Sequence, residues 1–213
     1  NRKISHNLGS VPAMMLIKQA NNDYSWAVYH KDIGNDHYMQ LNTTGGASGA
    51  SSNLQWNSTT PTATEFTVHT HTTTNGAPFT HVAYLFADNS AEDADEQMIK
   101  CGSYTGTAAD LSINLGWEAQ FVLVKNISSA RDWRLVDSMR GAVTGGYQSI
   151  LAPNTNAVEQ SATDFLHFNS LGFELYASGG ADVNSNGDSY IYMAIRAPMM
   201  VEPEAATDVF AIT

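Results

Sequence analysis

Short apolar runs alternate with polar, glycine-containing stretches along the whole chain. Residues 14–18 and 121–125 are mostly apolar and end in lysine, and their length is that of a buried strand. Residues 82–87 and 190–195 are apolar at successive positions, as strands buried on both faces are. No segment keeps a 3.6-residue period over three turns, so the pattern predicts many short strands and no long helix.

The runs recur as two copies that are offset by 107 residues. The matching blocks keep one order: residues 8–9 and 115–116, 13–18 and 120–125, 25–30 and 132–137, 65–68 and 172–175 and, with two further residues inserted, 81–86 and 190–195. A repeated order of this kind indicates homologous units. We therefore predict an all-β fold of two tandem, homologous β-sandwich domains that are jelly-roll-like, at residues 1–87 and 100–198.

The segment between the copies is acidic. Five of the ten residues from Asp88 to Gln97 are Asp or Glu, and almost no large apolar residue lies among them. We interpret residues 88–99 as a solvated linker; a calcium site is the alternative, although the spacing lacks the central glycine of such loops. Residues 199–213 are assigned to a C-terminal tail.

The first copy lacks a segment that the second copy has. A strand-and-turn segment at residues 100–106 precedes Leu115-Gly116, whereas only seven residues precede Leu8-Gly9. Two explanations are open: the chain is the C-terminal part of a longer protein whose opening strand lies upstream, or the first domain borrows a strand from a neighbour.

The composition argues against several classes of binding partner. Charged residues make up only 15% of the chain, against a typical value of about 25%. Ten basic and 21 acidic residues give a net charge of -11, which argues against nucleic acid and anionic membranes as partners. No apolar stretch approaches the length that spans a bilayer. The single cysteine, Cys101, cannot form an intramolecular disulfide, and we expect it to be a buried strand residue rather than a nucleophile.

Both copies resemble a domain of bacteriophage virion proteins. The blocks that carry the resemblance are residues 10–18, 26–30, 41–44, 56–62 and 84–87 in the first copy, and residues 102–106, 137–141 and 190–196 in the second, with a similar ending at 203–211. This family is common in tailed phages of aquatic bacteria, often cyanophages. Its members are usually described as tail-fibre or other structural proteins, and no catalytic or binding residue carries over from them.

Two clusters of polar residues are candidates for metal ligands. His69 and His71 flank one residue, so in a strand they would point to the same face and could share a zinc or nickel ion. The side chains of Asp182, Asn184, Asn186 and Asp188 follow the first half of a calcium loop, but the closing acid is missing. For the two histidines we favour an ordinary polar strand surface. For the second cluster we favour an Asn-Gly turn that recurs in the first copy at Asn75-Gly76. We therefore predict no metal and no cofactor.

Aromatic side chains are the remaining candidates for ligand binding. Trp26 and Trp133 are equivalent in the repeat, which predicts that they fill the two cores. Trp56 has no counterpart and lies in a polar loop, so we expect it to be exposed; with Tyr29 and Tyr38 it would offer sugar rings an apolar face. No motif of a hydrolase, a metalloprotease or a phosphate-binding loop is present, and the protein is predicted not to be an enzyme.

We therefore expect a non-enzymatic structural protein of a phage virion. It would lie on the outer surface, as a tail or tail-fibre component that contributes to assembly and to host attachment, with other virion proteins and further copies of itself as partners. The alternatives are a receptor-binding module that recognises host surface glycan and a capsid decoration protein.

Overall fold

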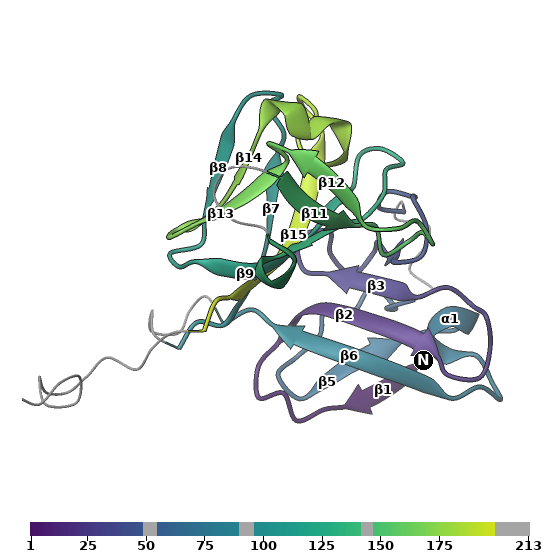
Figure 1. Ribbon diagram of the computed structural model, residues 1–213. Coiled ribbons are helices and arrows are strands. Elements are labelled where there is room, and N and C mark those ends of the chain that lie inside the picture. Colours follow the sequence, from purple (N-terminus) through teal and green to yellow (C-terminus); the bar gives the residue numbers. More distant parts are fainter. Residues whose placement is uncertain (49–54, 90–95, 142–146, 199–213) are drawn as a thin grey trace, which may run out of the picture.

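A computed structural model describes residues 1–48, 55–89, 96–141 and 147–198 (Figure 1). The strands are β1 (Arg2–Ser5), β2 (Pro12–Gln19), β3 (Ala27–His30), β4 (Met39–Gln40), β5 (Glu65–Val68), β6 (His81–Ala87), β7 (Ile99–Thr105), β8 (Leu111–Asn114), β9 (Ala119–Asn126), β10 (Arg134–Asp137), β11 (Tyr147–Leu151), β12 (Gln160–Thr163), β13 (Leu166–Asn169), β14 (Gly172–Leu175) and β15 (Ser189–Arg196). The helical segments in this part of the chain are α1 (Thr72–Asn75), η2 (Ser138–Arg140) and η3 (Ala177–Asp182). The all-β prediction is confirmed.

Each half of the chain contributes two antiparallel sheets. In the first half the strand orders are β4-β3-β2-β6 and β1-β5; in the second they are β12-β11-β10-β9-β15-β7 and β13-β14-β8. The strands β9, β10 and β14 begin 107 residues after β2, β3 and β5, at the offset that the sequence repeat predicts. The described part of the first half contains no counterpart of β7.

The four sheets are stacked face to face, and an apolar layer lies between each sheet and the next. On β2, Met15 and Ile17 face the β1-β5 sheet, whereas Met14 faces the second half, because successive side chains on a strand point to opposite faces. The layer between the two sheets of the second half is also apolar. There Val122 and Val124 of β9 pack against Phe173 and other residues of β13, β14 and β8.

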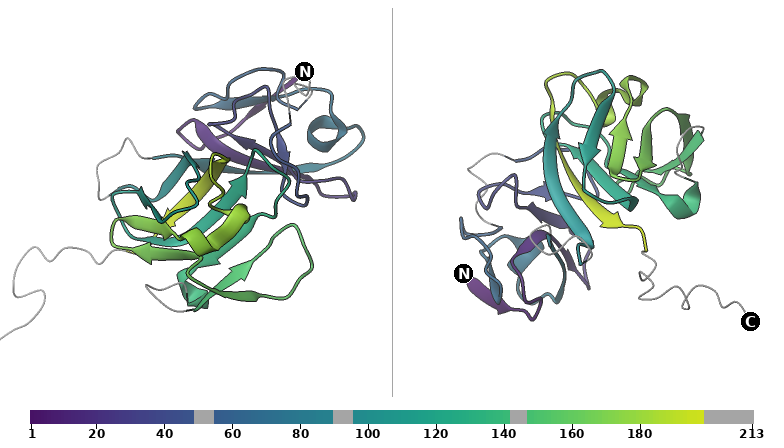
Figure 2. Two further views of the ribbon diagram at one scale, coloured as in Figure 1. Left: turned by 90° about the horizontal axis from the view of Figure 1, so that it is seen from above. Right: turned by 90° about the vertical axis from the view of Figure 1, so that its left-hand side faces the viewer.

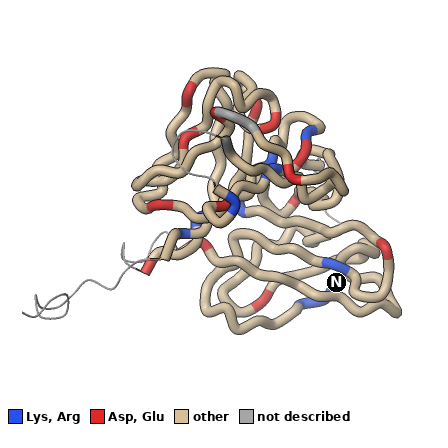
Figure 3. The backbone as a smooth tube through the Cα atoms, viewed as in Figure 1, with Lys and Arg blue, Asp and Glu red and all other residues tan. Residues whose placement is uncertain are grey.

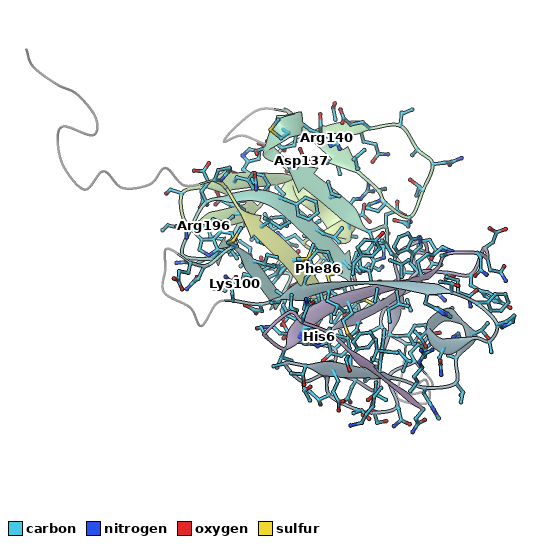
Figure 4. The ribbon with its side chains drawn as sticks, turned by 90° about the horizontal axis from the view of Figure 1, so that it is seen from below. His6, Phe86, Lys100, Asp137, Arg140 and Arg196 are labelled. Atoms are coloured by element: carbon cyan, nitrogen blue, oxygen red, sulfur yellow. The ribbon has the colours of Figure 1, made fainter. Side chains whose placement is uncertain are left out.

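The middle layer joins the two halves. Met14 and Val28 from the first half pack with Cys101, Leu123 and Met193 from the second. Figure 2 shows the two halves side by side in both views, and Phe86, which also packs on this layer, lies where they meet (Figure 4). The halves are therefore connected by a continuous core as well as by the chain.

Polar contacts at the edge of this layer fix the relative position of the halves. The indole Nε1 of Trp133 donates to the carbonyl of Gln40 at 3.0 Å. The buried ammonium of Lys125 donates to the carbonyl of Thr44 at 2.9 Å and to that of Arg131 at 2.6 Å. These donors belong to the second half, while two of their three acceptors belong to the first half: Gln40 ends β4, and Thr44 lies in the loop after it.

The acidic linker is described only at its ends. Asp88 forms an ion pair with Lys31, and the side-chain oxygen of Asn89 accepts the backbone N–H groups of Met98 and Ile99. Residues 90–95, which hold most of the acidic side chains, and the tail 199–213 lie outside the described residues. Among the helical segments of the described chain, none is long and apolar enough to cross a membrane.

Candidate functional site

The residues predicted to bind glycan do not form an exposed site. Trp56 is only 1% exposed, and Tyr29 is 3% exposed. The two rings meet edge to face with centroids 5.7 Å apart, and the indole Nε1 of Trp56 donates to the carbonyl of His37 at 3.0 Å. Tyr38 is half-buried against the same cluster. The expectation that Trp56 is exposed is wrong, because its loop turns the ring into the core between the first two sheets.

The two histidines proposed as metal ligands lie in the short segment between β5 and α1. β5 ends at Val68, so His69 and His71 do not alternate along one strand. His71 instead caps α1, where its Nδ1 accepts the backbone N–H of Thr73 at 3.3 Å. Burial lowers the pKa of His71 below its usual value of 6.5. Within the described residues, no three His, Cys, Asp or Glu side chains gather closely enough to hold a metal ion.

The calcium-like segment uses its oxygens within the protein. Asp182 accepts Nη2 of Arg134 at 2.6 Å, and Asn184 Oδ1 accepts the backbone N–H of Thr107 at 2.9 Å. Asp188 accepts the amide of Asn126 at 2.8 Å. These side chains point to separate partners. The fourth, Asn186, is exposed and precedes Gly187 in a turn.

The predicted Asn-Gly turn is present in one copy only. Gly187 has a φ of 80°, which favours glycine, and the turn leads into β15. Asn75 instead ends α1, and Gly76 has an ordinary φ of -75°. In both copies a short helical segment, α1 or η3, lies between strands of different sheets, so neither turn is a hairpin between paired neighbours.

Cys101 lies in β7 at the interface between the halves. It is 2% exposed, as the sequence predicted for a strand residue. Burial raises the pKa of its thiol far above the usual value, with the nearby Asp88 adding to the effect. The thiol therefore stays protonated and packs as a small apolar group.

An aromatic surface that the sequence did not single out lies on the first half. Trp26, predicted to fill the core, is only half-buried and stacks on the exposed Tyr84 with ring centroids 6.1 Å apart. The two rings border a shallow cavity of about 600 Å³, whose polar lining includes Lys18, Asn22 and Asp23. Trp133, the repeat counterpart of Trp26, is 1% exposed because the other half covers it. The repeat identified the equivalence but carried no signal for this difference in cover.

Charged side chains are dispersed over the described chain. Figure 3 shows Lys and Arg interspersed with Asp and Glu on both halves. Several are paired, such as Lys3 with Glu65 and Arg140 with Asp137, the second pair being labelled in Figure 4. Exposed pairs of this kind contribute little stability.

The comparisons with known proteins identify a family but no function. A family model described as "Domain of unknown function (DUF7483)" matches residues 1–198. No curated protein and no solved structure gives a significant match.

Proposed function

The chain belongs to the DUF7483 family, and we propose that it is a non-enzymatic structural component of a phage virion, in the tail or a tail fibre. The observation that supports a structural role is the continuous core across both halves. Met14 of the first half and Met193 of the second share one buried layer, and Trp133 and Lys125 donate hydrogen bonds to Gln40 and Thr44 of the first half. Such an arrangement gives a module of fixed shape with sheet edges and faces for assembly. The assignment to a phage rests on the sequence resemblance.

The location can be tested on particles. Purified virions of the phage that encodes this sequence are labelled with an antibody against the chain and viewed by electron microscopy, and their proteins are identified by mass spectrometry. We expect label on the tail or its fibres. Label confined to the head would replace this proposal by the capsid-decoration alternative, and absence of the chain from the particles would overturn both.

The aromatic surface favours a second candidate function, recognition of host glycan. Trp26 and Tyr84 offer apolar ring faces, and Asn22 and Asp23 offer hydrogen-bonding groups beside them. Binding to host surface polysaccharide is measured by a glycan array for the wild type and for Trp26→Ala. Met139→Ala is the control, because that side chain is 92% exposed in the second half. Binding that Trp26→Ala does not weaken, or no binding at all, would refute this function.

A further inference from the structure

The outer edge of β6 is the starting point. In the second half, β15 is paired on one side with β9 and on the other with β7. In the first half, β6 is paired with β2, and no described strand pairs with its other side. A strand edge of this kind presents unpaired N–H and C=O groups, to which another strand can add.

β7 also supplies a side chain to the core of the second half. The ring of Tyr104 stacks on Tyr190 with centroids 4.9 Å apart and an interplanar angle of 6°. Its hydroxyl donates to the carbonyl of Val183 at 2.7 Å. Tyr104 thereby closes one side of the sandwich, and Tyr190 and Tyr192 are 0% and 6% exposed.

The first half has an open groove at the corresponding place. His81 and Ala83 occupy the positions of Tyr190 and Tyr192, since they pair with residues of β2 that lie 107 positions before their partners on β9. Ala83 is exposed and His81 half-buried. Both border a groove of about 400 Å³ whose apolar lining includes Ile17, Phe66 and Val68. Phe66 is the counterpart of Phe173, which contacts Tyr192 edge to face.

The opposite face of β6 is uncovered as well. Val82 and Tyr84, on that face, are 42% and 49% exposed.

We propose that the outer edge of β6 and the adjoining groove accept a strand of the β7 type, with an aromatic side chain, from a separate partner protein. The strand would run antiparallel to β6, as β7 runs along β15, and would place an aromatic side chain in the groove opposite His81. This inference rests on the proposed role in assembly, for which it supplies a docking mode. Its failure would leave the virion location intact, because that is measured separately on particles.

A labelled peptide with the sequence of residues 98–106 and Cys101→Ser provides the test. It is titrated by fluorescence anisotropy into the full chain, and hydrogen exchange locates the contact. We expect saturable binding, protection of the β6 amides and a loss of at least about tenfold in affinity when Tyr104 of the peptide is replaced by Ala, since a buried aromatic ring dominates such contacts.

Variants of the chain test the groove itself. Ala83→Trp fills the groove and should weaken peptide binding at least about tenfold, whereas Ala157→Trp, on an exposed loop of the second half, should leave binding unchanged. Circular dichroism and the thermal midpoint check that both variants fold. No binding, or binding that neither replacement weakens, would overturn the proposal. Binding only to a chain that ends at Pro198 would also overturn it, because the tail would then be the occupant.

Discussion

The imidazole of His30, on β3, donates from Nε2 to the backbone carbonyl of Tyr192, on β15, across 3.2 Å. The other ring nitrogen, Nδ1, accepts the backbone N–H of Asp32 at 3.2 Å, so the proton lies on Nε2 and the ring is neutral. His30 is 0% exposed. One neutral histidine therefore links the two halves through their shared core.

The link should be sensitive to acid. Burial lowers the pKa of His30 below 6.5, against smaller opposing effects of the Tyr192 carbonyl and Asp32. The unfolded chain thus binds a proton near pH 6.5 that the folded chain does not bind, and stability is lost as the pH falls below that value. We expect the free energy of unfolding, measured with urea, to fall more steeply below pH 6.5 in the wild type than in His30→Gln. Parallel pH curves would contradict this explanation.

Lys125 should give a pH dependence of the same sign in the alkaline range. Burial lowers its pKa from 10.5 to about 8, although Asp132 and Asp182 oppose the shift. Between these values the unfolded state binds the extra proton, so stability rises with pH relative to a chain without the lysine. After allowance for solvent screening we expect a relative gain of about 2 kcal/mol. The measurement compares the wild type with Lys125→Met by urea unfolding across this range; the comparison cancels the titration of Cys101 and the tyrosines. A constant difference between the two would exclude the effect.

The two equivalent tryptophans should differ in their contribution to stability. Trp133 is buried between the halves and donates a hydrogen bond, so Trp133→Ala should cost about 3–5 kcal/mol. Trp26 is half-buried and stacks on one exposed ring, so Trp26→Ala should cost about 1 kcal/mol. Urea unfolding of the matched pair measures both values. Equal costs would mean that the cover on Trp133 contributes nothing.

Calcium should not affect the stability of the protein. The oxygens of Asp182, Asn184 and Asp188 already accept hydrogen bonds from Arg134, Thr107 and other groups, and they point to separate partners. We expect the thermal midpoint to be the same with millimolar-range calcium and with EDTA, because a ligand stabilises only a fold that binds it. A calcium-dependent rise that Asp188→Asn abolishes would restore the ion site.

The sequence by itself determined the strands and their repetition. The apolar runs at 14–18 and 121–125 became β2 and β9, at the predicted offset, because alternation and strand length are local properties of the chain. The same reasoning placed Cys101 in a buried strand. Alignment of the two copies also predicts a counterpart of β7 that the first copy, over residues 1–87, does not contain as a sequence block.

Only the tertiary structure decided which surfaces are covered. The sequence predicts an exposed loop position for Trp56, but its ring lies in a core. The repeat predicts the same burial for Trp26 and Trp133, but only Trp133 is fully buried. The two positions differ because Trp133 packs in the layer between the halves and donates to Gln40 of the first half, whereas Trp26 stacks on the exposed Tyr84 beside a cavity. Burial depends on the packing of residues far apart in the chain, and a repeat specifies the shape of each copy without specifying what packs against it.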